Sequence, residues 1–390
     1  MTDDDDAAPR IHWIDDDGAE QSAAWRSLAS HPAPQRVQMV DDTLSADAAY
    51  RLACEGCGLL WIGDFQNARA LLQALGRRVD SKAQRGANPR TANLKEAFLA
   101  QRRAQAQRAR VLGMLLLPFD ADHSVPLRRA PDVRAAGLEA HGPVDAHYVA
   151  SLRELLGLIG AHEWRKNGVP IDALGGARIH PHHGVYSPVR GEYVELVAQQ
   201  ALPAAVASAG AFDIGCGTGV LAAVLARRGL SVIATDIDPR ARACAVENLA
   251  RLKLTHNVKV LEADLFPPGR AGVVVCNPPW VPATPSSRLD AAVYDADSAM
   301  LRGFLAGLSA HLAPGGEGWL VLSDLAEHLG LRTREELLGW IAQSGLEVIG
   351  RSEIRPHHGK ATDKGDPLHR ARVAEITSLW RLAPQSQRSS

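Results

Sequence analysis

The chain has 390 residues, 46% hydrophobic and 22% charged, and a formal net charge of -1. That length favours two domains with ordinary cores, and the near-neutral charge excludes a whole-molecule field that would draw the protein to nucleic acid or an anionic membrane. No apolar run reaches the roughly 18 residues of a membrane span, and the N-terminus lacks a signal-peptide pattern. Five cysteines are too few for a disulfide framework. We therefore expect a cytoplasmic protein with no membrane segment.

The beginning of the chain is acidic. Residues 3–6 read DDDD and residues 15–17 read DDD, with few apolar residues around them. Such a composition buries too little surface to fold and is typical of a solvated segment. Residues 1–35 are therefore predicted to be an acidic, disordered tail.

Residues 36–170 mix strand-like and helical segments. The apolar run GLLWIG at 58–63 favours a strand, while the Ala-, Gln- and Arg-rich stretch at 92–111 and the leucine spacing over 144–166 favour helices. We expect a smaller α/β or mainly helical N-terminal domain here, which would dock the substrate.

A basic segment runs from Lys82 to Arg110. The only acid between these ends is Glu96, and the cations are Lys82, Arg85, Arg90, Lys95, Arg102, Arg103, Arg108 and Arg110. Two interpretations stay open. The segment could supply phosphate contacts to a nucleic acid, or it could be a solvated helix, since aromatic residues are absent apart from Phe98.

Residues 177–385 follow a different pattern. Short β-branched runs alternate with helical runs from AFDIG at 211–215 to EITSLWRL at 375–382. This alternation predicts a parallel, doubly wound sheet with helices on both faces. Ligands of such sheets bind beyond the carboxyl ends of the strands, so the residues directly after each strand are the candidates for a site.

The first of these strands is followed by a glycine-rich turn, in the sequence DIGCGTGV. Gly215, Gly217 and Gly219 allow a sharp turn and a close approach of a ligand to backbone N–H groups at a helix start. Val220 stands where the dinucleotide fingerprint requires another glycine, which disfavours NAD. A plain turn from strand to helix is the alternative.

Acidic residues follow the next two strands. Asp236, in ATDIDP, comes about twenty residues after the first glycine, where a carboxylate can accept hydrogen bonds from ribose hydroxyls. Asp264, in EADLFP, could accept from the exocyclic amine of an adenine while the Leu265 backbone reads the edge of the ring. Helix caps or solvated loop groups are the alternative for such acids.

The fourth strand ends in NPPW. Asn277, Pro278, Pro279 and Trp280 follow the apolar run VVVC, and two prolines force the chain to leave the sheet in a rigid shape. Such rigidity suits a clamp for a substrate. The alternative is a strand stop with Trp280 as a core anchor.

Taken in this order, DIGCGTG, TDIDP, EADLF and NPPW resemble the class I methyltransferases that use S-adenosylmethionine, in particular amino-methyltransferases with an NPPY or NPPW motif. The resemblance covers roughly residues 186–382. It implies a Rossmann-like sheet of seven strands with an antiparallel last strand. It also implies that the three glycines, with Asp213 nearby, hold the methionine part of the cofactor, Asp236 the ribose, and Asp264 and Leu265 the adenine.

The same resemblance assigns the clamp. The side-chain oxygen of Asn277 and the carbonyl of Pro278 would accept hydrogen bonds from a planar nitrogen, Pro279 would fix the turn, and Trp280 would stack on the acceptor. Asn277 would also border the cofactor. The motifs are similar to those of release-factor glutamine methyltransferases and of ribosomal RNA guanine and adenine methyltransferases, so a protein glutamine or an RNA base is the expected acceptor.

Three histidines precede the glycine turn. His180, His182 and His183 lack a Cys at zinc-ligand spacing, so no metal site is expected, and their participation in substrate binding stays open. A small-molecule N-methyltransferase and a non-catalytic cofactor-binding protein are the alternative functions. The intact NPPW disfavours the second of these, and the oligomeric state is not predicted.

Overall fold

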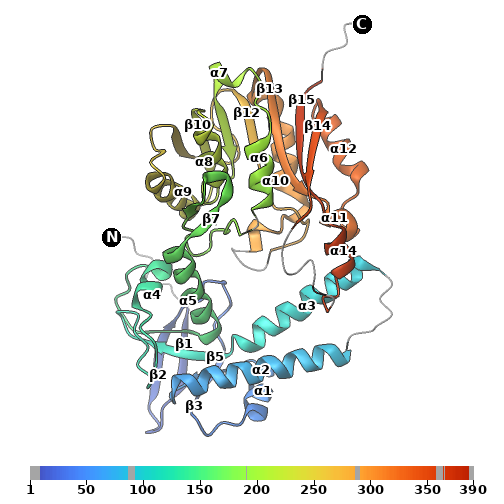
Figure 1. Ribbon diagram of the computed structural model, residues 1–390. Coiled ribbons are helices and arrows are strands. Elements are labelled where there is room, and N and C mark those ends of the chain that lie inside the picture. The colour runs from blue at the N-terminus through green and yellow to red at the C-terminus, as the bar shows by residue number, and fades with distance from the viewer. Residues whose placement is uncertain are drawn as a thin grey trace. The chain divides into compact units, whose positions relative to one another are not determined.

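The computed structural model describes residues 9–86, 93–189, 191–285, 290–356, 363 and 365–385. The chain forms two compact units (Figure 1), one of residues 1–91 with 99–163 and one of residues 92–98 with 164–390. The helix α3 (Leu94–Leu112) contributes its first residues to the second unit and the remainder to the first. No helix of the described residues is long and apolar enough to cross a membrane.

The first unit is an α/β domain built on a mixed sheet of six strands, in the order β1-β2-β6-β5-β4-β3. Its core lies between this sheet and the helices, around Trp61, Phe65 and Tyr148. Besides α3, its elements are β1 (Arg10–Ile14), β2 (Glu20–Trp25), β3 (Arg36–Val40), α1 (Ala46–Cys54), β4 (Cys57–Trp61), α2 (Phe65–Gly86), β5 (Leu115–Phe119), α4 (Arg134–His141), β6 (Tyr148–Ser151) and α5 (Leu152–Asn167). The last residues of α5, from Trp164, belong to the second unit.

The predicted disordered tail over residues 1–35 is wrong from Arg10 onward. Strands β1 and β2 pair antiparallel as a hairpin, with Ile11 and Trp25 buried. The acidic run over residues 15–17 forms the turn of this hairpin, where Asp15 accepts hydrogen bonds from the backbone N–H groups of Asp17 and Ala19. The aspartates at residues 15–17 therefore form a tight turn and are not part of a disordered tail. Asp3 to Asp6 lie outside the described residues.

The helix expected over residues 144–166 is also wrong in its first part. Tyr148–Ser151 is the strand β6, in the interior of the sheet and buried along its whole length, and α5 begins only at Leu152. A fully buried strand has no polar side to reveal its period, so the sequence could not separate it from the helix that follows.

The second unit carries a sheet of seven strands, in the order β11-β10-β9-β12-β13-β15-β14. Strand β15 runs antiparallel to β13 and β14, which confirms the predicted Rossmann-like architecture. The strands of this sheet are β9 (Ala211–Ile214), β10 (Val232–Asp236), β11 (Val258–Glu262), β12 (Ala271–Cys276), β13 (Leu312–Ser323), β14 (Leu346–Ile354) and β15 (Thr377–Pro384). The unit also contains a separate two-stranded sheet of β7 (Val169–Ile171) and β8 (Ala177–Ile179). Its helices are α6 (Glu192–Gln199), α7 (Val206–Ala209), α8 (Val220–Arg227), α9 (Pro239–Arg251), α10 (Ala299–His311), α11 (Leu325–His328), α12 (Arg334–Gln343) and α14 (His369–Ala374), with the 3₁₀ turns η1 (Asp172–Leu174), η2 (Asp290–Ala292) and η3 (Ala296–Ser298).

Helices cover both faces of this sheet. Along β12, Val273 and Val275 point to a core shared with α6, α8 and α9, while Val274 and Cys276 point to a core shared with α10 and α12. All residues of β12 are buried, as expected for a parallel strand with helices on either side. This double cover leaves the carboxyl edge of the sheet as the place where loops can form a site.

Candidate active site

Three strand ends lie side by side at the carboxyl edge of the sheet. In the register of the parallel strands, Ile214 pairs with Thr235 of β10 on one side and with Cys276 of β12 on the other. The next residue of each strand is therefore Gly215, Asp236 or Asn277, and neighbouring strands are about 4.8 Å apart. The glycine turn is thus flanked by the predicted ribose-binding acid and by the amide of the clamp.

The glycine turn depends on left-handed backbone at all three glycines. Gly215, Gly217 and Gly219 have φ of 69°, 53° and 78°, a region that other residues enter only at a cost. A Cβ at Gly215 would lie 2.5 Å from the terminal methyl carbon of Met300, whereas a Cβ at Gly217 would have nothing within 4 Å. The turn is therefore packed at its first glycine and open at its second.

Asp213 fixes the helix that follows this turn. Its side chain is buried, and its Oδ2 accepts a hydrogen bond of 2.8 Å from the backbone N–H of Ala222 in α8. Burial raises the pKa of Asp213 to about 7, against the opposing effect of the Ala222 N–H, and the charge of Asp236 acts in the same direction as burial. The observed contact is therefore with the helix start.

Asp236 joins the strand end to the turn. One carboxylate oxygen accepts from the N–H of Gly217 at 3.0 Å and the other from the N–H of Asp238 at 2.9 Å. Burial raises the pKa of Asp236, although both N–H groups oppose the shift. Each carboxylate oxygen retains a further lone pair for an additional donor.

Asp264 and Leu265 lie beyond the end of β11. Asp264 is exposed, while Leu265 has a φ of 70° and its carbonyl accepts a hydrogen bond of 2.6 Å from the Thr235 hydroxyl. A Cβ at Gly303 of α10 would come within 2.8 Å of the Leu265 side chain. Leu265 is held on both sides, so the loop has a defined shape next to β10.

The clamp residues contact one another. The indole N–H of Trp280 donates a hydrogen bond of 2.8 Å to the side-chain oxygen of Asn277. Pro278 is buried, while Asn277, Pro279 and Trp280 are half-buried. Trp280 also packs against three hydrophobic clusters of this unit, so its ring anchors the turn as well as orienting the amide.

Sequence reasoning missed the residues that support the clamp. The N–H of Asp295 donates to the carbonyl of Val281 at 3.0 Å, and the Asp295 carboxylate accepts from the N–H of Met300 at 2.9 Å at the start of α10. The chain after NPPW is thus tied to the helix whose Met300 covers Gly215. An acid just before a helix is a recognisable cap signal, but nothing in the sequence relates it to Val281.

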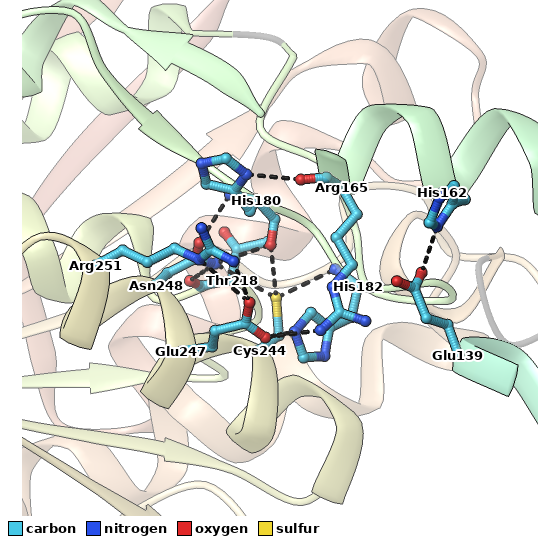
Figure 2. A network of polar contacts seen from close by, with 10 residues as sticks. All are labelled: Glu139, His162, Arg165, His180, His182, Thr218, Cys244, Glu247, Asn248 and Arg251. Carbon is cyan, nitrogen blue, oxygen red and sulfur yellow. Dashed lines mark hydrogen bonds and ion pairs between the residues drawn. The ribbon is translucent and has the colours of Figure 1, made fainter. Parts of the chain in front are cut away.

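His180 and His182 belong to a polar network that ties the chain before the glycine turn to α9 (Figure 2). The backbone N–H of His180 donates to Asn248 at 2.7 Å, and Asn248 in turn donates to the carbonyl of Thr218, inside the turn. His182 contacts Glu247 at 2.7 Å, and Glu247 also pairs with Arg165 and Arg251. These contacts hold the glycine turn and the chain before it against α9.

Part of the basic segment is engaged within the protein. Arg108 pairs with Asp80 at 2.9 Å, and Arg110 donates to Gln107. On α3, Lys95, Arg103 and Arg110 are exposed, whereas the side chain of Arg85 and all of Arg90 lie outside the described residues.

Residues 176–338 match the family model of the methyltransferase small domain. The chain is 36% identical over 111 residues to a ribosomal RNA small subunit methyltransferase C of Alcanivorax borkumensis, a match that covers 28% of this chain and 30% of that protein. It is 32% identical over 149 residues to a release factor glutamine methyltransferase of Moorella thermoacetica, covering 32% and 53%.

A third relative is the tRNA1(Val) (adenine(37)-N6)-methyltransferase of Bacteroides thetaiotaomicron, 38% identical over 74 residues, with 17% of this chain and 31% of that protein covered. The chain spans less than two thirds of the length of each of these three relatives. The matches confirm the resemblance to class I methyltransferases that the strand-end motifs indicated.

Proposed function

We propose that this protein, whose residues 176–338 match the family model of the methyltransferase small domain, transfers a methyl group from S-adenosylmethionine to a planar amide or exocyclic amino nitrogen of a macromolecule. The observation that carries the proposal is the register of β9 and β12, which sets Asn277 directly beside Gly215. An amide that can bind a planar nitrogen is thereby next to a turn that suits a cofactor. Protein glutamine and RNA bases are the acceptors considered, since the relatives are named for such substrates.

The residues of the turn fit S-adenosylmethionine. The open side of Gly217 leaves room for a ligand against the backbone, and the carboxylate of Asp236 is fixed beside it by the Gly217 N–H. We assign Gly215, Gly217 and Gly219, with Asp213, to the amino-acid part of the cofactor, Asp236 to the ribose, and Asp264 with Leu265 to the adenine. When bound, S-adenosylmethionine supplies a methyl group on a positively charged sulfur, which makes that carbon electrophilic.

Asn277 and Pro278 would orient the acceptor. A planar nitrogen is a poor nucleophile because its lone pair is delocalised. If its two N–H bonds donate to the Asn277 side-chain oxygen and the Pro278 carbonyl, the lone pair is directed away from both. Positive charge grows on the nitrogen as its new bond forms, so both acceptors bind the transition state more strongly than the ground state.

Trp280 holds the amide in place for this role. Its indole N–H donates a hydrogen bond of 2.8 Å to one lone pair of the Asn277 side-chain oxygen. The other lone pair remains for an N–H of the methyl acceptor. The fixed amide needs little reorganisation during the reaction, which is the main advantage of a preorganised site. The half-buried ring can also offer a face for a flat acceptor to stack on.

The N-terminal unit is proposed to dock the macromolecule, and the reaction is proposed to take place in the cytoplasm. All five cysteines are free, a state that a reducing compartment maintains. The exposed cations of α3 and the distinct α/β fold of the first unit support a docking role, which a small-molecule enzyme would not need.

The proposal is tested by transfer of labelled methyl groups into a cell extract by the purified protein, with Asn277→Ala as the matched control. The products are divided and treated with protease or with nuclease. Label that only protease releases identifies a protein acceptor, and label that only nuclease releases identifies RNA. Label confined to small molecules, or equal incorporation by Asn277→Ala, would refute the proposal.

A further inference from the structure

Arg332 is a buried cation whose Nε and Nη2 atoms have no hydrogen-bond partner among the described residues. It lies in the loop between α11 and α12, beyond the carboxyl end of β13, and is 3% exposed. Its Nε and Nη2 atoms are enclosed and meet no hydrogen-bond partner among the described residues. A buried charged group in this state is costly, so its presence calls for a function.

The acids that surround Arg332 are bonded elsewhere. Its charge interacts at longer range with Glu327, Glu336 and Asp295. Both oxygens of Glu327 accept from Arg334, at 2.8 and 2.9 Å. Glu336 accepts from the N–H of Thr333 in a capping box, and Asp295 accepts from the start of α10. None of them hydrogen-bonds to Arg332, and burial lowers the pKa of Arg332 from its ordinary value.

The two unpaired nitrogens make up one specific edge of the guanidinium. The N–H bonds at Nε and Nη2 are parallel and match the spacing of two oxygens on a carboxylate or phosphate. This edge is the part of the side chain that binds such anions in a bidentate manner. The group that would complement this edge is therefore an oxyanion.

The loop that carries Arg332 packs with residues of the clamp. Leu329 and Leu331, which precede Arg332, belong with Val281 and Trp280 to one hydrophobic cluster. Asp295, whose charge interacts with Arg332, donates its N–H to the Val281 carbonyl. The N-terminal part of α3 contributes Phe98 to the same cluster, and its ring centroid is 6.3 Å from that of Tyr294. Lys95, in the first turn of α3, is exposed.

We propose that the Nε and Nη2 edge of Arg332 binds a backbone phosphodiester of an RNA methyl acceptor, an inference that rests on the proposed methyl transfer to a planar nitrogen. The chemistry of the two candidate acceptors decides between them. Every base in RNA carries phosphodiesters next to it, whereas a glutamine side chain brings no anion of its own. A guanidinium edge without a partner among the described residues, on a loop that packs with the clamp, therefore favours a nucleotide. Because both nitrogens are enclosed, the phosphate must displace the side chains that cover them.

The first test measures thermal unfolding of the full chain in chloride buffer. Arg332→Met replaces an unpaired buried charge with an unbranched apolar side chain, so we expect the unfolding midpoint to rise by at least about 2 °C. The matched control is Arg334→Met, which should lower the midpoint because Glu327 then loses its partner. A lower or unchanged midpoint for Arg332→Met would show that Arg332 stabilises the fold through its contacts, and would overturn the proposal.

The second test uses dimethyl phosphate as a probe for a phosphodiester and acetate as a probe for a carboxylate, at equal ionic strength. Dimethyl phosphate should raise the midpoint of the natural protein more than acetate does, and neither should affect Arg332→Met. Arg332→Lys should also fail to respond, because it keeps the charge but lacks the parallel N–H pair. A larger effect of acetate would assign the site to a protein carboxylate and refute the RNA assignment.

The third test measures binding of a fluorescein-labelled, mixed-sequence, single-stranded RNA by anisotropy. Arg332→Met should bind the RNA at least tenfold more weakly, which corresponds to about 1.4 kcal/mol. The slope of the logarithm of its binding constant against the logarithm of the salt concentration should be shallower by about 0.7. Equal binding by both proteins would overturn the proposal. This measurement of RNA binding needs no methyl transfer, so it separates the two proposals. If Arg332→Met weakens RNA binding but the natural protein methylates nothing, the proposed function alone is refuted. If the natural protein methylates RNA but Arg332→Met binds RNA equally well, this inference alone is refuted.

Discussion

Replacing Asn277 with alanine should slow turnover while leaving the binding of S-adenosylmethionine nearly unchanged. The substitution removes the acceptor that is proposed to face the methylated nitrogen and deprives the Trp280 indole of its hydrogen bond. The glycine turn keeps its own support, because Gly217 is bonded to Asp236 and α8 to Asp213. The cofactor contacts therefore survive, and only the orientation of the acceptor is lost.

The magnitude follows from the kind of contact. A hydrogen bond to a charged group contributes about 1.5–3 kcal/mol, and a contact to developing charge in a preorganised site can reach about 2.7–4 kcal/mol. We therefore expect kcat to fall roughly 100-fold, which corresponds to about 2.7 kcal/mol. The dissociation constant of the cofactor should change by less than about threefold. Because Asn277 is half-buried, stability should fall by only about 1 kcal/mol.

The assay combines steady-state methyl transfer with calorimetric titration of the cofactor. Trp280→Phe is the matched control, since it retains a ring but removes the N–H donor that orients Asn277. That control should lose about 2- to 10-fold in kcat, the equivalent of one neutral hydrogen bond. Parallel losses of cofactor affinity and turnover in Asn277→Ala, or a kcat within threefold of the natural value, would contradict the role assigned to the amide.

Three further predictions concern the turn and its supports. Gly217→Ala and Gly229→Ala each place a methyl group at positive φ with nothing within 4 Å, so each variant should lose about 1–2 kcal/mol of unfolding free energy. Only Gly217→Ala should weaken cofactor binding in calorimetry. Burial raises the pKa of Asp213 from 3.8 to about 7, so its stabilising effect is fully present below about pH 4 and is lost as the pH rises through 7. Asp213→Asn should therefore gain about 4 kcal/mol of unfolding free energy relative to the natural protein between pH 4 and 8 in urea unfolding, and a constant difference would contradict this. Burial acts to raise the pKa of Glu247, but Arg251, His182 and Arg165 outweigh burial and hold this pKa at about 2. Glu247→Gln should therefore lower the free energy of unfolding by about 1 kcal/mol at pH 7 after solvent screening, and this loss should shrink in urea unfolding as the pH falls from 4.5 towards 2.

The doubly wound sheet and the residues that adjoin one another in its site could be predicted from the order of amino acids. Gly215, Asp236 and Asn277 each follow an apolar strand, and parallel strands in this topology bring their carboxyl ends to one edge. The alternation of short strands with helices is a local pattern, so it can be read from the chain. The same pattern failed at β6, where a fully buried strand merges with the helix after it, and at the acidic turn between β1 and β2.

The pairing of side chains, in contrast, became visible only in the folded chain. Nothing in the sequence relates Trp280 to the oxygen of Asn277, Met300 to Gly215, or the capping acid Asp295 to Val281. The isolation of Arg332 is the clearest case, because a sequence with Glu327, Arg334 and Glu336 nearby would suggest an ordinary surface ion pair. Burial and bonding geometry arise from contacts between distant elements, and those contacts determine whether a charged side chain is satisfied or remains available for a ligand.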